Sequence, residues 1–266
     1  MSAEAARDII SQLDLQVGSR PLGNPYFNDP GVISFPFSKD AFKKIPQMGS
    51  DRKLAFVDGG NLELLGAPNF SVQLNRIYAS VWKKNARYST LNLPQVEFFS
   101  AIFTTFNDEG KLVYQTLIVP CNTGYAKLLP DSVDLTFSPF EETIKNGLQM
   151  ADTSKVGSIA RNFAEWKFAA HVAECLESDD ILVMDGSLQT NFKNEQKYFR
   201  FLEETTQRKG VILSSISKTS ALFTDSGLSL LGAISQFASN AKMNGEWYHP
   251  VFDSKKHHLY CLIVKL

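Results

Sequence analysis

Cysteine is scarce in this sequence, and charge of either sign is nearly balanced. The 266 residues contain three cysteines, Cys121, Cys175 and Cys261, with no CxxC pair. This excludes a disulfide framework and favours reduced, buried thiols in a cytoplasmic protein, with a zinc or redox role as the less favoured alternative. The formal net charge is −1, so binding of nucleic acid would need a local cationic patch.

Long hydrophobic runs are also missing. No segment reaches the roughly 20 apolar residues of a membrane-spanning helix, and residues 2–15 read as an acidic amphipathic helix without the apolar centre of a signal peptide. We therefore expect a soluble, cytoplasmic protein with no membrane partner. Hydrophobic residues make up 44% of the chain, which is enough for a substantial buried core.

The composition changes near residue 50. Residues 17–48 are rich in Gly, Pro, Asn and Phe, and their prolines exclude a long helix. We expect residues 1–50 to form a short helix followed by an irregular arm. The arm either covers a sheet edge, which we favour, or wraps a partner. Residues 51–266 are expected to form one α/β domain.

Two segments share a pattern of apolar residues followed by Asp and Gly. They are LAFVDGG, which contains Asp58, and ILVMDGSL, which contains Asp185. Both patterns are typical of strands buried on both faces, and open α/β sheets bind ligands beyond the carboxyl ends of their strands. If the strands are parallel neighbours, about 4.8 Å separates them. A divalent cation would then relieve the repulsion between the carboxylates.

Periodicity predicts the remaining elements. Residues 59–69 are expected to be rich in turns. Apolar alternation predicts strands over residues 72–82, 96–106, 111–119 and 258–266, and an apolar run predicts a buried strand over 211–217. Helical spacing predicts helices over residues 154–176, 194–209, ended by Gly210, and also 140–150 and 228–241. Strand 181–188, helix 194–209 and strand 211–217 form a βαβ unit, which requires a parallel pair.

Three further side chains are candidates for a site. Glu165 lies beside the apolar stripe of the 154–176 helix, where it either pairs with Arg161 in solvent or leans toward the aspartates. Lys218, in the loop after the 211–217 strand, is either a phosphate contact or an exposed loop lysine. His249 is a weaker candidate for a metal or phosphate role, and we expect the pair at positions 257 and 258 to be surface histidines.

The order of these elements is that of a ribonuclease H-like mixed sheet, strand order 3-2-1-4-5, flanked by helices. The chain also resembles the NurA nucleases, which work with the HerA hexameric translocase in DNA end resection. The resemblance rests on FVDGG, RNFAEWKFA, VMDGSL and SISKTS, which occur in this order within residues 50–266.

This resemblance implies a site and an activity. Asp58, Glu165 and Asp185 would be the acidic ligands of two Mn²⁺ ions, with Mg²⁺ as an alternative, and Lys218 would contact the phosphate or the transition state. The implied reaction is hydrolysis of DNA phosphodiesters, as a 5′ to 3′ exonuclease and a single-strand endonuclease. The implied partners are DNA, a HerA-like hexameric ATPase and a second copy of the chain in a homodimer.

The sequence departs from the family in two places. Gly60 stands where the family often has Ser. The family also continues into Tyr-Pro and Ala-His motifs that are not found before Leu266, and Tyr248-His249-Pro250 resembles them only superficially. The alternative expectation is therefore a catalytically weak or inactive subunit that docks on a ring ATPase. A phosphotransferase of the actin or hexokinase type is a third interpretation, disfavoured because a second Gly-rich strand-turn-strand repeat is absent.

Overall fold

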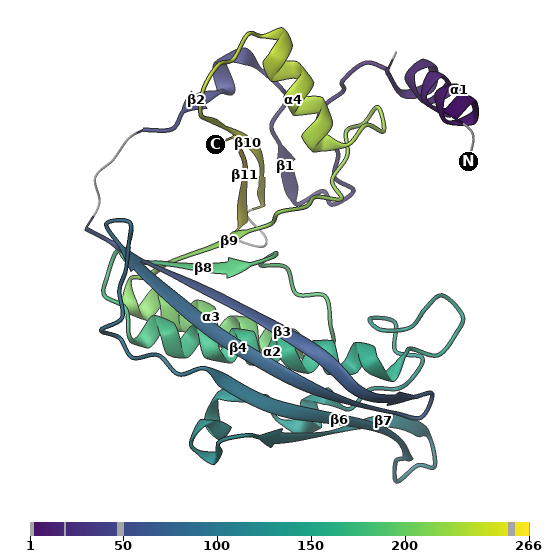
Figure 1. The fold of residues 1–266 in the computed structure, drawn as a ribbon, viewed down its shortest axis with the longest axis vertical. Helices are drawn as coiled ribbons and strands as arrows, with labels where there is room; N and C mark the ends of the chain where they lie inside the picture. The colour runs from purple at the N-terminus through teal and green to yellow at the C-terminus, as the bar shows by residue number, and fades with distance from the viewer. Residues whose placement is uncertain (1–2, 19, 47–50, 255–258, 266) are drawn as a thin grey trace. The chain divides into compact units, whose positions relative to one another are not determined.

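The computed structural model describes residues 3–18, 20–46, 51–254 and 259–265. The chain divides into two compact units (Figure 1). The sheet unit is Gly49–Ser217, and the terminal unit combines Met1–Met48 with Lys218–Leu266. One point of division lies near residue 50, where the composition changes. Residues 218–266, however, group with the N-terminal residues, whereas we expected one domain over residues 51–266.

The sheet unit is built on a mixed sheet of seven strands. The antiparallel part contains β3 (Lys53–Ala67), β4 (Phe70–Lys83), β5 (Ala86–Arg87), β6 (Val96–Phe106) and β7 (Leu112–Pro120). The parallel part adds β8 (Ile181–Asp185) and β9 (Ile212–Ile216) to β3. The order across the sheet is β7-β6-β4-β3-β8-β9, with β5 beside β4.

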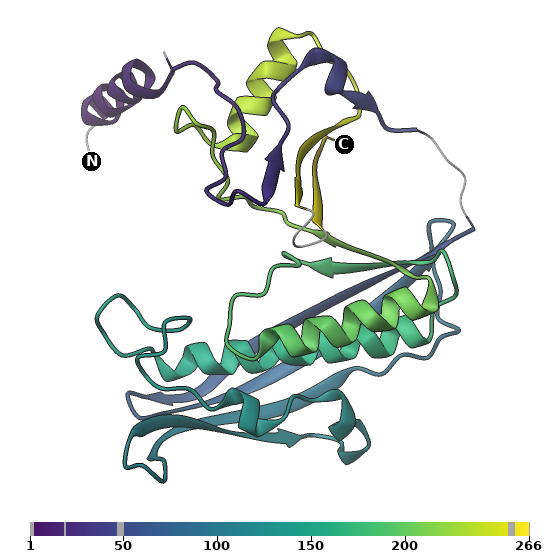
Figure 2. The same ribbon diagram turned by 180° about the vertical axis from the view of Figure 1, so that it is seen from behind.

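Two helices cover one face of this sheet, α2 (Thr153–Glu174) and α3 (Glu195–Lys209), as Figure 1 and Figure 2 show from opposite sides. α2 lies between the sheet and α3. The ring of Phe163 stacks on Tyr198 of α3 at 4.7 Å, and Trp166 Nε1 donates to Glu195 Oε1 at 3.0 Å. Both predicted helices are confirmed, and α3 ends at Gly210, whose φ of 67° is favourable for glycine.

β3 is longer than expected. Residues 59–69 were predicted to be rich in turns, and this is wrong: β3 continues to Ala67, and only residues 68–69 turn the chain into β4. The cause is the pairing with β4 along the whole length of β3, which holds Gly59 and Gly60 in extended backbone. Asp58 therefore lies within β3 and not at its end.

One face of the sheet is turned away from α2 and α3, and we call it the open face. Side chains alternate between the two faces along a strand, and Leu54 of β3, which points to the open face, is 37% exposed. The prediction that this strand is buried on both faces is therefore wrong. In β8 the same prediction is confirmed, because Leu182, Val183 and Met184 are all buried.

The helix predicted at residues 140–150 does not form, and these residues make a series of turns. Phe140, Ile144 and Leu148 have helical spacing, but of the three only Ile144 is buried, and Leu148 is 96% exposed. Gly147 adopts a φ of 60°, outside the helical range. A helix at this place would have no continuous apolar face to bury.

The terminal unit contains a second sheet, formed by β10 (Trp247–Ser254) and β11 (Leu259–Lys265). β1 (Val32–Ser34) and β2 (Lys43–Lys44) pair with β10, so the N-terminal arm covers a sheet edge, as favoured. This pairing also explains why residues 218–266 group with the N-terminal residues. The unit further contains α1 (Ala3–Leu13) and α4 (Leu230–Asn240). β11 and α4 were predicted, whereas β10 was not.

Two expectations from composition can be compared with the structure. All three cysteines are free, but Cys121 is exposed and the other two are partly buried, so the expectation of buried thiols is wrong for Cys121. Across the described ranges, no helix has both the length and the apolar character that crossing a membrane requires.

Candidate functional site

The pairing of β3 with β8 places Asp58 next to Asp185. The two strands run parallel, and their last paired residues are Val57 and Met184. Continuing this register by one residue brings the two aspartates side by side on the open face, at the spacing of neighbouring strands. β8 ends at Asp185, whereas β3 continues. The sheet is therefore narrower beyond this point, which leaves the edge of β3 accessible beside the two carboxylates.

The carboxylate of Asp58 is held from two sides. The backbone N–H of Gly59 donates to Oδ1 at 2.7 Å, and the hydroxyl of Tyr78 donates to Oδ2 at 3.3 Å. Tyr78 lies directly opposite Asp58 in the antiparallel pair of β3 and β4. These two hydrogen bonds fix the orientation of a carboxylate that solvent can still reach.

Glu165 approaches the aspartates from α2, over Gly59. A Cβ atom added at Gly59 would lie 2.4 Å from Glu165 Oε1 and 3.1 Å from the carbonyl oxygen of Arg76, so only glycine leaves room for this carboxylate. The Glu165 side chain is 12% exposed. Both interpretations of the sequence hold in part, because Glu165 is paired with Arg161 and is also buried near the aspartates.

Arg161 links α2 to β3 at this point. Its Nη1 forms an ion pair with Glu165 Oε1 and also donates to the carbonyl oxygen of Gly59 at 3.0 Å. Its Nη2 donates to Asn162 Oδ1 at 3.0 Å. Arg161 therefore orients Glu165 and supplies one positive charge to a cluster of three acids.

The titration of Glu165 is shifted strongly. Burial raises the pKa of Glu165 to about 7; the charge of Arg161 opposes this rise, while the charges of Asp58 and Asp185 add to it. The three carboxylates thus lie within electrostatic reach of one another, although they come from β3, α2 and β8. We call Asp58, Glu165 and Asp185 the acid cluster.

The acid cluster can be tested as a metal site by its chemistry. Within the part of the chain that the structure describes, no three His, Cys, Asp or Glu side chains are arranged to hold a metal ion. The donor set itself fits a hard divalent cation, because all three donors are carboxylates. Burial and the other two acids also disfavour the charged form of Glu165, and a bound cation would reverse that effect.

The other predicted residues lie in the terminal unit. Lys218 is an exposed residue at its start, and its role as a phosphate contact stays a prediction. His249 is fully buried, with the rings of Phe37 and Phe42 at centroid distances of 5.9 and 4.7 Å, and burial lowers its pKa. These contacts identify His249 as a core residue. Positions 257 and 258 lie outside the described residues.

Gly59→Ala is expected to destabilise the protein by about 1 to 3 kcal/mol, because the new methyl group would displace Glu165 or the backbone of Arg76. Gly60 offers a matched control, since a Cβ added there meets nothing within 4 Å. Gly60→Ala should change the free energy of unfolding by less than about 0.5 kcal/mol. Urea unfolding of both variants measures the difference, and equal stabilities would contradict the packing of Glu165 over Gly59.

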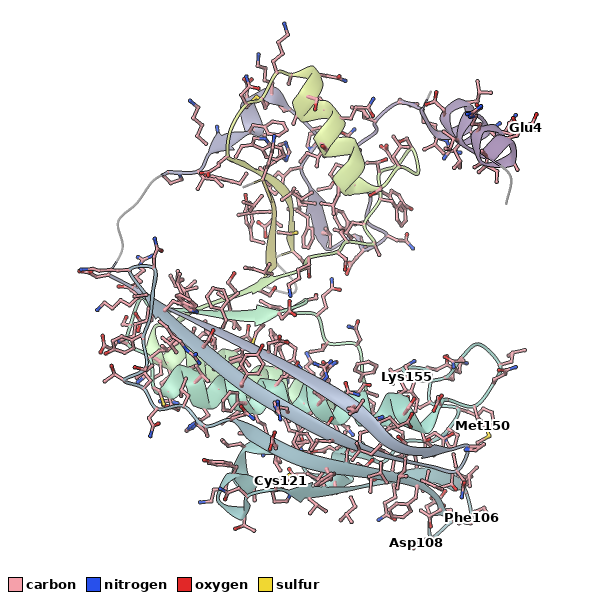
Figure 3. The ribbon with its side chains drawn as sticks, in the orientation of Figure 1. Glu4, Phe106, Asp108, Cys121, Met150 and Lys155 are labelled. Carbon is pink, nitrogen blue, oxygen red and sulfur yellow. The ribbon has the colours of Figure 1, made fainter. Side chains whose placement is uncertain are left out.

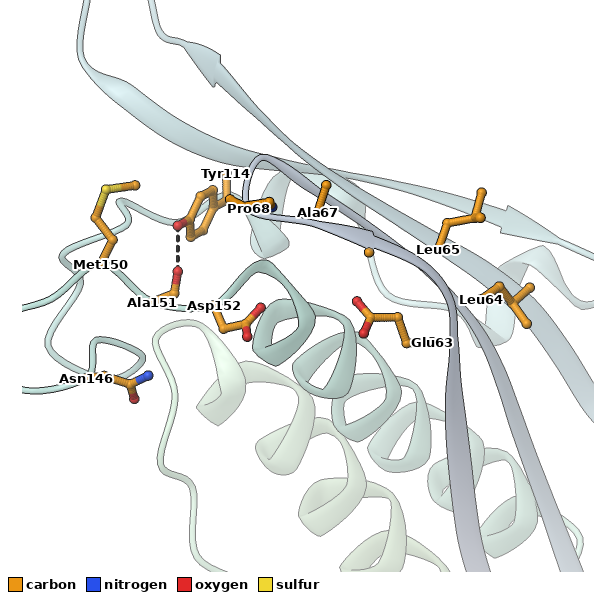
Figure 4. Close-up of a pocket in the computed structure, with 11 residues that line it drawn as sticks. Glu63, Leu64, Leu65, Ala67, Pro68, Tyr114, Asn146, Met150, Ala151 and Asp152 are labelled. Atoms are coloured by element: carbon orange, nitrogen blue, oxygen red, sulfur yellow. Dashed lines mark hydrogen bonds between the residues drawn. The ribbon is translucent and has the colours of Figure 1, made fainter.

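A separate hollow of about 740 Å³ lies at the β3–β4 turn and the start of α2 (Figure 4). Its two carboxylates have local structural roles: Glu63 accepts from the hydroxyl of Ser71 at 2.6 Å, and Asp152 caps α2 by accepting from the backbone N–H of Ser154 at 2.9 Å. Its lining includes no His, Cys or Lys. The acid cluster is therefore the stronger candidate for chemistry.

Comparison with known protein families, with curated proteins and with solved structures found no match to this chain.

Proposed function

We propose that this chain is a metal-dependent DNA nuclease with a ribonuclease H-like sheet. The observation that carries the proposal is the convergence of Asp58, Glu165 and Asp185, which come from three separate elements to one place on the sheet. The strand order supports it: β3 lies between an antiparallel neighbour, β4, and a parallel neighbour, β8, in the series β6-β4-β3-β8-β9. β7 adds one further strand at the edge.

Each residue of the cluster has a task in this proposal. Asp58 and Asp185 present carboxylates on the open face, and Tyr78 and the backbone of Gly59 keep Asp58 oriented. Glu165 adds a third carboxylate from α2, in the space that the missing side chain of Gly59 leaves, and Arg161 favours its charged form. When bound by these three acids, Mn²⁺ or Mg²⁺ would activate the attacking water and stabilise the leaving oxygen of the phosphodiester.

The finer assignment rests on the NurA resemblance alone. It comprises 5′ to 3′ exonuclease and single-strand endonuclease activity, a homodimer, and action with a HerA-type hexameric ATPase in DNA end resection. Lys218 would then contact the phosphate as a point charge.

A specific observation favours a second candidate function. Glu165 is ion-paired with Arg161, and a carboxylate engaged in this way binds a cation only if the ion pair rearranges. This favours low activity, and the NurA resemblance would then imply a subunit whose main role is to dock on a ring ATPase. The two candidates differ in one measurable property, which is hydrolysis of DNA by the isolated protein.

The test is incubation of the protein with end-labelled linear duplex and single-stranded DNA. We expect hydrolysis in Mn²⁺, loss of hydrolysis when EDTA is added, and recovery when Mn²⁺ is restored in excess. Hydrolysis that persists in EDTA would contradict the metal mechanism. No hydrolysis in either Mn²⁺ or Mg²⁺ would favour the docking subunit.

A further inference from the structure

Two aromatic side chains on β4 form a row that starts at the acid cluster. Tyr78 and Trp82 are separated by four residues, so both point to the open face, about 13 Å apart along the strand. They are 45% and 39% exposed. Tyr78 is also the residue whose hydroxyl contacts Asp58. The row therefore leads from the carboxylates along the exposed surface of β4.

The far end of this row is cationic. The turn that follows β4 contains Lys84, and Arg87 of β5 lies directly opposite Trp82. Lys84 forms an ion pair with Asp51 at 2.7 Å, so the cationic turn has two cations, Lys84 and Arg87, and one acid. The protein as a whole has a net charge of −1, so this cationic turn is a local departure from the average, next to an exposed tryptophan.

We propose that a single strand of nucleic acid lies along β4 on the open face, with bases stacked on Tyr78 and Trp82 and phosphates on the cationic turn. The inference rests on the proposed nuclease function and adds to it the residues that position the strand over the acid cluster. Aromatic rings stack on any base, so such a surface binds with little sequence preference. A protein partner would match the rings, but the adjacent cations complement the charge of a phosphate backbone.

Trp82 offers a direct signal for this contact. Of the three tryptophans in the chain, Trp166 and Trp247 are buried and Trp82 is exposed. The probe is an oligothymidylate of twelve nucleotides, titrated in Ca²⁺ without Mn²⁺ so that binding is measured apart from hydrolysis. Stacking should quench the intrinsic fluorescence of the wild-type protein. Trp82→Phe should lose this signal and keep its affinity, because the ring that stacks is retained.

Affinity is measured separately, by anisotropy of the labelled oligonucleotide. Trp82→Ala and Tyr78→Ala should each weaken binding about tenfold, which is within the range for loss of one stacking ring. Phe201→Ala is the matched control, because Phe201 is an exposed aromatic residue on α3, outside the open face. Arg87→Gln should reduce the slope of log affinity against log salt by about 0.7, the value for one phosphate contact.

The outcomes separate this inference from the nuclease proposal. Affinity that falls in Trp82→Ala and Tyr78→Ala but not in Phe201→Ala supports the inference, even if the wild-type protein hydrolyses no DNA. Unchanged affinity in both variants, or no binding by the wild-type protein, overturns it, even if hydrolysis is observed. Sedimentation of the same variants tests whether a second copy of the chain occupies the open face instead. Loss of self-association without any change in oligonucleotide affinity would also overturn the inference.

Discussion

Asp185→Asn is expected to lower the rate of Mn²⁺-dependent DNA hydrolysis by at least about a thousandfold. Asp185 ends β8 beside Asp58, and the neutral amide of Asn cannot balance the charge of a divalent cation. Loss of the stabilisation that a bound metal would give the transition state raises the activation free energy by several kcal/mol. Each 1.36 kcal/mol lowers the rate tenfold. The measurement is the initial rate of release of labelled nucleotides at saturating Mn²⁺.

A matched control for this variant is Asp108→Asn. Asp108 lies in the exposed turn between β6 and β7 (Figure 3), on the same sheet but not in the acid cluster. It should hydrolyse DNA at the wild-type rate, and circular dichroism should show the same fold in both variants. If the Asp185→Asn protein is folded and retains half of the wild-type rate, Asp185 is not required for hydrolysis.

The sequence was sufficient to predict that the two aspartates lie side by side, although not that Asp58 lies within its strand. Asp58 and Asp185 follow similar apolar runs, and two parallel neighbouring strands with the same pattern bring the same position to one place, which is what β3 and β8 do. The helix of Glu165 was also predictable, because its apolar residues recur at spacings of three and four. These are local signals of composition and period.

The contacts of the acid cluster could not be predicted in the same way. Glycines at 59 and 60 suggest a turn, and this interpretation hides the register of β3 against β4, which alone places Tyr78 opposite Asp58. The room that Gly59 gives to Glu165 depends on how closely α2 packs on β3. Such distances follow from tertiary packing and leave no periodic signal in the sequence.

Errors in predicted burial have the same cause. The apolar residues of the 194–209 segment predict that Phe201 points inward with Tyr198 and Leu202, but Phe201 is exposed, while Tyr198 and Leu202 are buried. An apolar residue identifies a segment as part of a core more reliably than it identifies its own environment, because a folded surface is itself largely apolar. The exposed rings of the open face are another example, and their exposure is what makes them candidates for binding.

Glu165 is expected to make the metal-free protein less stable as the pH rises from about 4.5 to about 7. Burial raises the pKa of Glu165 from 4.5 to about 7, so the folded state keeps the proton at pH values where the unfolded chain has lost it. The contribution of Glu165 to the free energy of unfolding is therefore fully present below pH 4.5 and is lost as the pH rises through about 7. A shift of about 2.5 units at 1.36 kcal/mol per unit gives a loss of about 3 kcal/mol.

Glu165→Gln isolates this effect, because glutamine has no proton to lose and resembles the protonated acid in shape. Urea unfolding in EDTA at pH 5 and pH 8 should show a loss in the wild-type protein that is about 3 kcal/mol larger than in the variant. Other titrating groups, such as His249, contribute equally to both proteins and cancel in this difference. Added Mn²⁺ should stabilise the wild-type protein at pH 8 more than the variant, since only ligands of the folded state raise stability. Parallel pH profiles for the two proteins would show that Glu165 titrates normally. This result would contradict electrostatic coupling between Glu165, Asp58 and Asp185.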